Sequence, residues 1–171
     1  MGSASDHWRD RQHLLVALLC AWLILTSPWI SMLRRVPSSA GWLDHAHVWL
    51  GFLAGLLAVS YTATCCADGR WRLHFPFLAA GMTAVGRDLG GLFRGRIPSA
   101  EAGGLFALLE GLLLVALLAT ALTGVAWFLL QGSDGVLAWR QWHLYAARSL
   151  TGLIVLHLVA VSLHLVELIR D

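Results

Sequence analysis

Two histidines on one apolar stretch have the spacing that lets a single helix carry two ligands. His143 and His157 are 14 residues apart. Fourteen steps of about 100° return to nearly the same helix face, at a separation of about 21 Å along the axis. One helix would therefore present two imidazoles on one side, one toward each leaflet of a bilayer.

Each of these imidazoles needs a partner at matching depth on another helix. His47 opens an apolar stretch at the level of His143, and His13 opens another at the level of His157. Haem iron accepts neutral imidazole at both axial positions, and this ligation suits electron transfer because no position stays open. We therefore expect two haem b groups. The expected iron ligands are His13, His47, His143 and His157.

Other interpretations of the histidines remain open. His164 lies seven residues after His157 on the same face, and it is an alternative ligand to His157. A lone histidine at a span end is more often an interfacial polar residue. This interpretation applies to His7, His45, His74 and His164. A haem-free structural membrane subunit would require the histidine register to be a coincidence.

The composition indicates which elements hold these residues. Of 171 residues, 58% are hydrophobic and 13% are charged, and a helix needs roughly 20 apolar residues to cross a bilayer. We expect an all-α fold: a transmembrane four-helix bundle in membrane lipid, forming a single domain over residues 1–171. The expected spans are about 14–33, 47–66, 104–130 and 142–169.

The connections differ in length. The loops 34–46 and 131–141 face one side of the membrane, and the loop 67–103 faces the other side together with both termini. Apolar residues in the long loop alternate with glycines and charges, which predicts a short amphipathic surface helix. These apolar residues are Phe77, Leu78, Val85, Leu89, Leu92 and Phe93.

Charge sets the expected orientation. All twelve basic residues are arginines, and eight of them lie on the side of the termini and the long loop. Arg34, Arg35 and Arg140 lie on the opposite side. By the positive-inside rule, we expect both termini in the cytoplasm and the protein in the bacterial inner membrane.

Several short motifs resemble a known superfamily over all four spans. Asp10-Arg11-Gln12-His13 is similar to the start of its first helix, and His47-Val48-Trp49-Leu50-Gly51 to its second-helix motif, which selects His47 over His45. Thr123-Gly124 and the histidines at 143, 157 and 164 are similar to the later helices. The chain resembles the four-helix di-haem cytochrome b superfamily, which includes bacterial cytochrome b561 and the cytochrome b subunits of formate dehydrogenase and nickel-iron hydrogenase.

The resemblance implies quinone chemistry beside the cytoplasmic haem. The implied position is the stretch before the third span, although the polar amide residues used in the formate dehydrogenase branch are absent there. The candidates for quinone or propionate contacts are Arg96, Ser99 and Glu101.

Three further residues are candidates for cofactor contacts. Gly51 and Gly124 would let a flat macrocycle approach a helix backbone, or would serve helix packing. Arg148 lies too deep in its span to be left unpaired. Its expected partner is a haem propionate, with Glu110 on the third helix as the structural alternative.

The function expected is transmembrane electron transfer between a periplasmic redox partner and the quinone pool of a respiratory chain. The partner would be a periplasmic redox protein or an iron-sulfur, molybdenum or nickel-iron subunit, and the chain an electron-transfer subunit rather than an independent enzyme. The alternative is a stand-alone superoxide:quinone oxidoreductase. The sequence has no catalytic triad or phosphate loop, and no nucleic-acid partner is expected.

Overall fold

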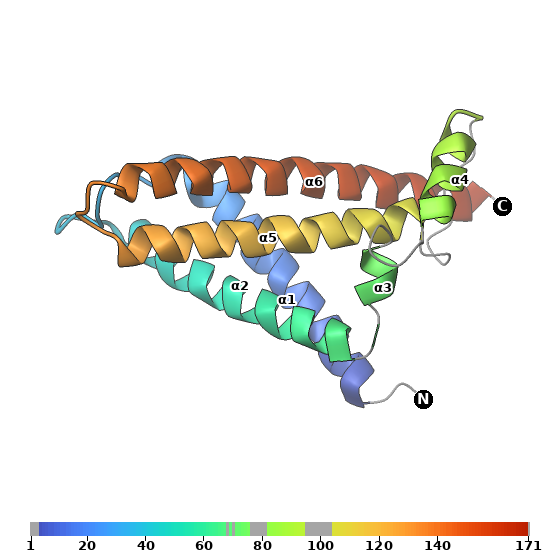
Figure 1. Cartoon of the computed structure of the whole chain (residues 1–171), viewed down its shortest axis with the longest axis horizontal. Helices are drawn as coiled ribbons and strands as arrows, with labels where there is room; N and C mark the ends of the chain where they lie inside the picture. The colour runs from blue at the N-terminus through green and yellow to red at the C-terminus, as the bar shows by residue number, and fades with distance from the viewer. Residues whose placement is uncertain (1–3, 68, 70, 76–81, 95–103, 171) are drawn as a thin grey trace. The chain divides into compact units, whose positions relative to one another are not determined.

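The regular elements of this computed structural model are helices throughout the described residues, which are 4–67, 69, 71–75, 82–94 and 104–170. Four of the helices are long and apolar enough to cross a membrane. These are α1 (Ala4–Thr26), α2 (Trp42–Ala67), α5 (Leu105–Leu129) and α6 (Val136–Arg170) (Figure 1). The expectation of an all-α fold with four transmembrane helices is confirmed.

The helix ends follow local chemistry rather than the hydropathy pattern alone. The first apolar span runs over Arg11–Trp29 and stops short of the expected boundary near residue 33. There α1 gives way to the short 3-10 helix η1 (Ser27–Trp29), because Pro28 has no N–H to continue the α-helical ladder. At the other boundary α6 begins at Val136 rather than near 142. Val136 is fully buried, so the helix starts with a core residue.

Two compact units make up the chain. The first contains Met1–Ala63 and Ala116–Arg148, and the second contains Thr64–Val115 and Ser149–Asp171. The first unit therefore holds α1, most of α2, the later part of α5 and the start of α6. The second holds the end of α2, the long loop, the start of α5 and the rest of α6. The expected single domain stays a prediction.

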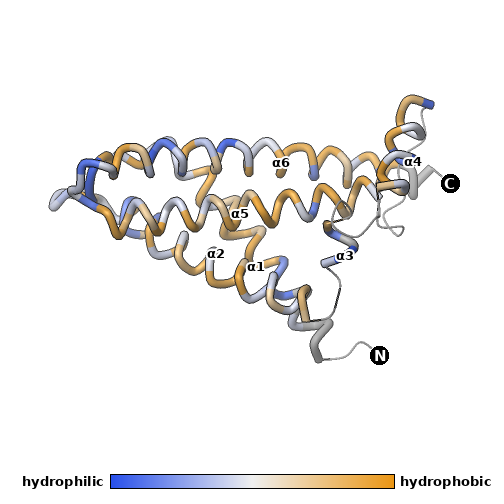
Figure 2. Tube along the Cα trace, in the orientation of Figure 1, coloured by the Kyte–Doolittle hydropathy of each residue, from blue (hydrophilic) through white to orange (hydrophobic). Residues whose placement is uncertain are grey.

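In the first unit, the α1–α2 loop is hydrogen-bonded to the α5–α6 turn at one end of the helices (Figure 1). The Val36 N–H donates to Gln131 Oε1 at 2.7 Å and the Gly132 N–H donates to the Arg34 carbonyl at 3.0 Å. A small core of Met32, Trp127 and Val136 lies beneath these bonds. In Figure 2 this loop end is largely hydrophilic, whereas α5 is hydrophobic along most of its length.

Asp44 joins the same loop to the start of α2. Its carboxylate is buried and accepts the N–H of Ser31 at 3.2 Å and of Gly41 at 3.3 Å. The second bond reaches from the third residue of the helix back to the residue before it, as an acidic side chain does in a capping box.

Replacing Asp44 with alanine would leave two backbone donors without their acceptor. We expect the free energy of unfolding to fall by about 2 kcal/mol, measured as a lower Tm of the purified protein in detergent by circular dichroism. Asp134, exposed in the α5–α6 turn, is the matched control, and its alanine variant should stay within about 0.5 kcal/mol of the wild type. Equal effects at the two positions would contradict this role.

The second unit contains two short helices from the long loop, α3 (Trp71–His74) and α4 (Met82–Leu92). The short amphipathic helix expected in this loop is α4, with Val85 buried; Phe77 and Leu78 lie outside the described residues. Asp88 on α4 accepts the Leu105 N–H at 2.8 Å. This carboxylate satisfies a free donor at the N-terminus of α5, where the helix dipole favours negative charge.

Candidate haem site

Two of the four expected ligands face each other in the first unit. His47 lies one turn into α2 and His143 lies two turns into α6. Their ring centres are 6.4 Å apart, and the ring planes are nearly perpendicular at 88°. The structure therefore brings together the pair that the sequence placed at the same depth.

His143 is held by the backbone of α5. Its Nδ1 lies 2.9 Å from the Thr120 carbonyl oxygen and 3.4 Å from the Thr123 hydroxyl oxygen. A carbonyl oxygen can only accept, so Nδ1 carries the proton and Nε2 keeps the lone pair for a metal. A ligating histidine commonly has its other N–H bonded in this way, which fixes both the tautomer and the ring orientation.

Gly124 makes room for this ring. A Cβ at position 124 would lie 3.2 Å from both Cε1 and Nδ1 of His143, which is closer than most side chains tolerate. The glycine at this position thus lets the imidazole lie against the α5 backbone. Gly51 differs, because a Cβ there would meet nothing within 4 Å.

The residues of this pair fit a haem. Two metal-imidazole bonds of about 2 Å, with each ring centre about 1 Å behind its ligating nitrogen, place two axial imidazoles roughly 6 Å apart between centres. The observed separation of 6.4 Å matches that value. In addition, Nδ1 of His47 is buried without a hydrogen-bond partner among the described residues, a costly state for a polar atom unless a further group satisfies the ring.

The second expected pair is divided between the two units. His13 belongs to the first unit and its side chain is exposed on α1. His157 belongs to the second, where its Nδ1 is buried and has no partner within the described part of the chain. His164 shares that property, and its ring centre lies 6.1 Å from that of Phe106. The pairing of His13 with His157 or His164 stays a prediction.

The remaining predicted site residues are either exposed or outside the described residues. His45 is exposed, unlike His47, and Arg148 is exposed on α6. The proposed quinone contacts Arg96, Ser99 and Glu101 lie outside the described residues.

Sequence reasoning missed three polar contacts. The Thr120 carbonyl leaves no signal in the sequence because any residue carries one. Gln12, beside His13, is fully buried and donates to Ser60 Oγ at 2.9 Å, which joins α1 to α2. His74 Nδ1 lies 3.3 Å from Glu110 Oε2; a carboxylate in an apolar helix was the signal for this pair.

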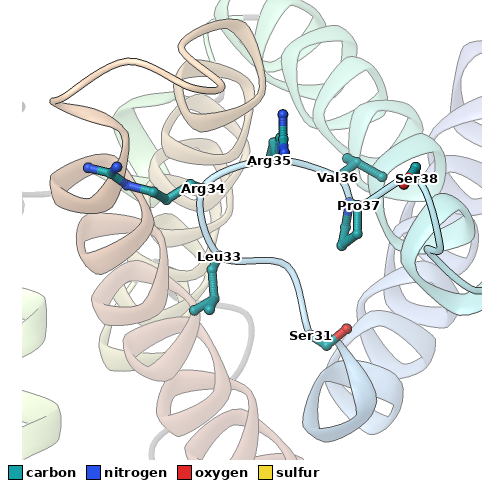
Figure 3. Close-up of a pocket in the computed structure, with 7 residues that line it drawn as sticks. All are labelled: Ser31, Leu33, Arg34, Arg35, Val36, Pro37 and Ser38. Carbon is teal, nitrogen blue, oxygen red and sulfur yellow. The ribbon is translucent and has the colours of Figure 1, made fainter.

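The α1–α2 loop also forms a surface pocket of about 530 Å³. Arg34 and Arg35 border it and extend in different directions from the loop (Figure 3). Arg140, a third arginine at this end, is hydrogen-bonded to the backbone: its Nε donates to the Met32 carbonyl at 3.0 Å. Neither His47 nor His143 lines this pocket, so the pocket and the facing imidazoles are separate features.

The four apolar helices indicate a multi-pass membrane protein, and the facing imidazoles of His47 and His143 have a separation that a haem-binding protein would use. The family model described as prokaryotic cytochrome b561 matches residues 10–169. The chain therefore belongs to the prokaryotic cytochrome b561 family, whose members are haem b proteins that transfer electrons in membranes. In comparisons with curated proteins and with solved structures, nothing matches this chain.

Proposed function

We propose that this protein carries two haem b groups and transfers electrons across the bacterial inner membrane between a periplasmic redox partner and the quinone pool. The observation that carries the proposal is the facing pair of His47 and His143, at a separation that fits axial ligation of one iron. The second haem rests on the sequence register of His13 with His157.

The chain's own residues explain why the proposed centre would transfer electrons and not bind oxygen. His47 and His143 would fill both axial positions, so no position remains for a diatomic ligand. The Thr120 carbonyl keeps the His143 proton on Nδ1 and leaves Nε2 free to ligate. Gly124 lets the ring approach α5 closely. A haem bound there supplies reversible one-electron exchange at its iron.

In the proposed orientation the termini and the long loop are cytoplasmic. The arginine distribution supports this orientation, since eight of the twelve arginines lie on that side. The haem of His47 and His143 would then lie near the periplasm, and quinone would react near the cytoplasmic haem. The proposed route of electrons joins these two ends.

A second candidate function is oxidation of superoxide by the protein acting alone, with its electron passed to quinone. The observation that favours it is the pair of arginines at the loop pocket, Arg34 and Arg35, because positive charge near the periplasmic haem would attract a small anion. A respiratory partner with an acidic docking face would use the same charges.

Purification from native membranes, followed by absorption spectroscopy, tests these proposals. We expect sharp visible bands of reduced bis-histidine haem and about two haems per chain in a pyridine haemochrome assay. Copurification of an iron-sulfur, molybdenum or nickel-iron subunit would support the respiratory role, whereas a solitary cytochrome that consumes superoxide would support the second. A purified, folded protein without haem bands after haem supplementation would refute both.

A further inference from the structure

A single ionisable side chain interrupts the apolar helix α5. All other residues of Leu105–Leu129 are uncharged, and Glu110 lies in the second turn with its side chain 49% exposed. An ionisable group in a membrane helix is costly and commonly marks a proton or ion pathway. About half of its side chain is exposed, so this carboxyl group is accessible from outside the protein.

Glu110 has a titratable partner in the same unit. His74 on α3 is only 13% exposed, and its Nδ1 lies 3.3 Å from Glu110 Oε2. An imidazole can both accept and donate a proton, so histidine is a common partner in proton transfer. Proton exchange between an imidazole and a carboxyl group needs this kind of short separation, directly or through one water molecule.

The backbone fixes this pair in place. A Cβ at Gly111 would overlap the carbonyl group of His74, so the glycine next to Glu110 allows α3 to lie against α5 (Figure 1). The neighbouring Asp88 contact holds α4 at the start of α5 in the same unit. Two contacts of the long loop thus converge on the first two turns of α5.

The pair also lies close to the C-terminal part of α6, where His164 is found. Phe106 precedes Glu110 by four residues, so both share one face of α5, and the Phe106 ring contacts that of His164. The other ionisable groups of the elements packed on this part of α5, among the described side chains, include Asp88 on α4, Arg72 on α3 and His164 on α6.

We propose that His74 and Glu110 form a proton-transfer pair that connects the aqueous side of the long loop to quinone in the lipid. This inference rests on the proposed function, because it needs quinone to react at this end of the protein. Reduction of one quinone takes two electrons, supplied by the haem irons, and two protons, one for each carbonyl oxygen. Glu110 gives a proton to a quinone oxygen, His74 returns one to the carboxylate, and water reprotonates His74. The sequence occurs twice for each quinol, and quinol oxidation reverses it.

The test uses the full chain with haem in lipid nanodiscs and decylubiquinol as the probe. Stopped-flow absorbance follows haem reduction across a range of pH. We expect Glu110→Gln and His74→Gln to slow it at least tenfold, while haem content and the dithionite-reduced spectrum stay unchanged. Glu110→Asp should retain most of the rate. Asp134→Asn and His45→Gln, in the first unit, are matched controls and should behave as the wild type.

Two further measurements separate proton transfer from a structural role. A small weak base, such as the acetate ion, should restore part of the rate in Glu110→Gln, because it accepts the protons that quinol oxidation releases without repairing a contact. Infrared difference spectra between low and high pH should contain a protonated-carboxyl band that is lost in Glu110→Gln. This band is independent of electron transfer.

The outcomes distinguish this inference from the function on which it rests. If decylubiquinol reduces the wild type and Glu110→Gln at the same rate and with the same pH profile, the proton-transfer pair is wrong and the cytochrome function stands. If Glu110→Gln loses haem or gains no rate from the added acetate, the residue has a structural role and the inference is also wrong. If decylubiquinol fails to reduce the wild type, the quinone function fails and the inference fails with it.

Discussion

Replacing His143 with alanine should lower the haem content from about two to about one per chain. Its Nε2 is free to ligate because Nδ1 is engaged by the Thr120 carbonyl, and alanine offers no ligand in its place. Loss of the proposed axial imidazole would remove a metal bond and leave a cavity beside the macrocycle. The pyridine haemochrome assay gives the count, and the visible spectrum of the reduced protein should lose one set of bands.

A double variant tests whether His143 and His47 serve the same haem. Replacement of His47 alone should have the same effect, and replacement of both should still leave about one haem, because residues that act on one site do not add. His45→Ala is the matched control, since it lies on the same turn of α2 and is exposed. Two haems retained in His143→Ala, or none left in the double variant, would contradict the assignment.

The facing pair of His47 and His143 could be predicted from sequence because the depth of a residue in a span follows from its position along the chain. The depth of His47 and of His143 follows from the distance of each to its span end, and the turn at residues 131–135 places both on one side. What could not be predicted is how the imidazole is oriented. That depends on the Thr120 carbonyl and on the space above Gly124, which are properties of packed backbone rather than of residue type.

In the fold, too, the sequence pattern predicted the helices, whereas packing and local chemistry determined where they begin and end. Hydropathy predicted four apolar helices correctly, but the end of α1 depends on Pro28 and the start of α6 on the burial of Val136. Likewise, Glu110 and His74 are separated by 36 positions in the sequence. Only the approach of α3 to α5, permitted by Gly111, brings their side chains together.

The two proposals place different tasks at the two ends of α5. Near the later end, Thr120, Thr123 and Gly124 orient the His143 imidazole with uncharged groups, which would add no charge beside the proposed haem. Near the early end, Glu110 supplies a titratable group. If both proposals hold, electron transfer and proton transfer depend on separate parts of one helix, and variants in one part should leave the other function measurable.

Replacing Gly124 with leucine should remove the haem that we propose for His47 and His143 while leaving the polypeptide folded. Even a Cβ at this position would lie 3.2 Å from two atoms of the His143 ring, so alanine should force a shift of a few tenths of an ångström and leucine a displacement of the whole ring. Leucine is a better helix former than glycine by roughly 1 kcal/mol, so α5 itself should not weaken. We expect about one haem per chain in Gly124→Leu and both haems, with an altered reduction potential, in Gly124→Ala.

Gly90→Leu is the matched control because a Cβ at that glycine of α4 would meet nothing within 4 Å. It should retain both haems and the wild-type potentials. Circular dichroism should give the same helix content for the control and for Gly124→Leu, which separates loss of the site from loss of the fold. If Gly124→Leu bound both haems with unchanged potentials, the close approach of His143 to α5 would have no part in holding the cofactor. The series of glycine, alanine and leucine at position 124 therefore measures how strongly the orientation of His143 depends on the lack of a side chain there.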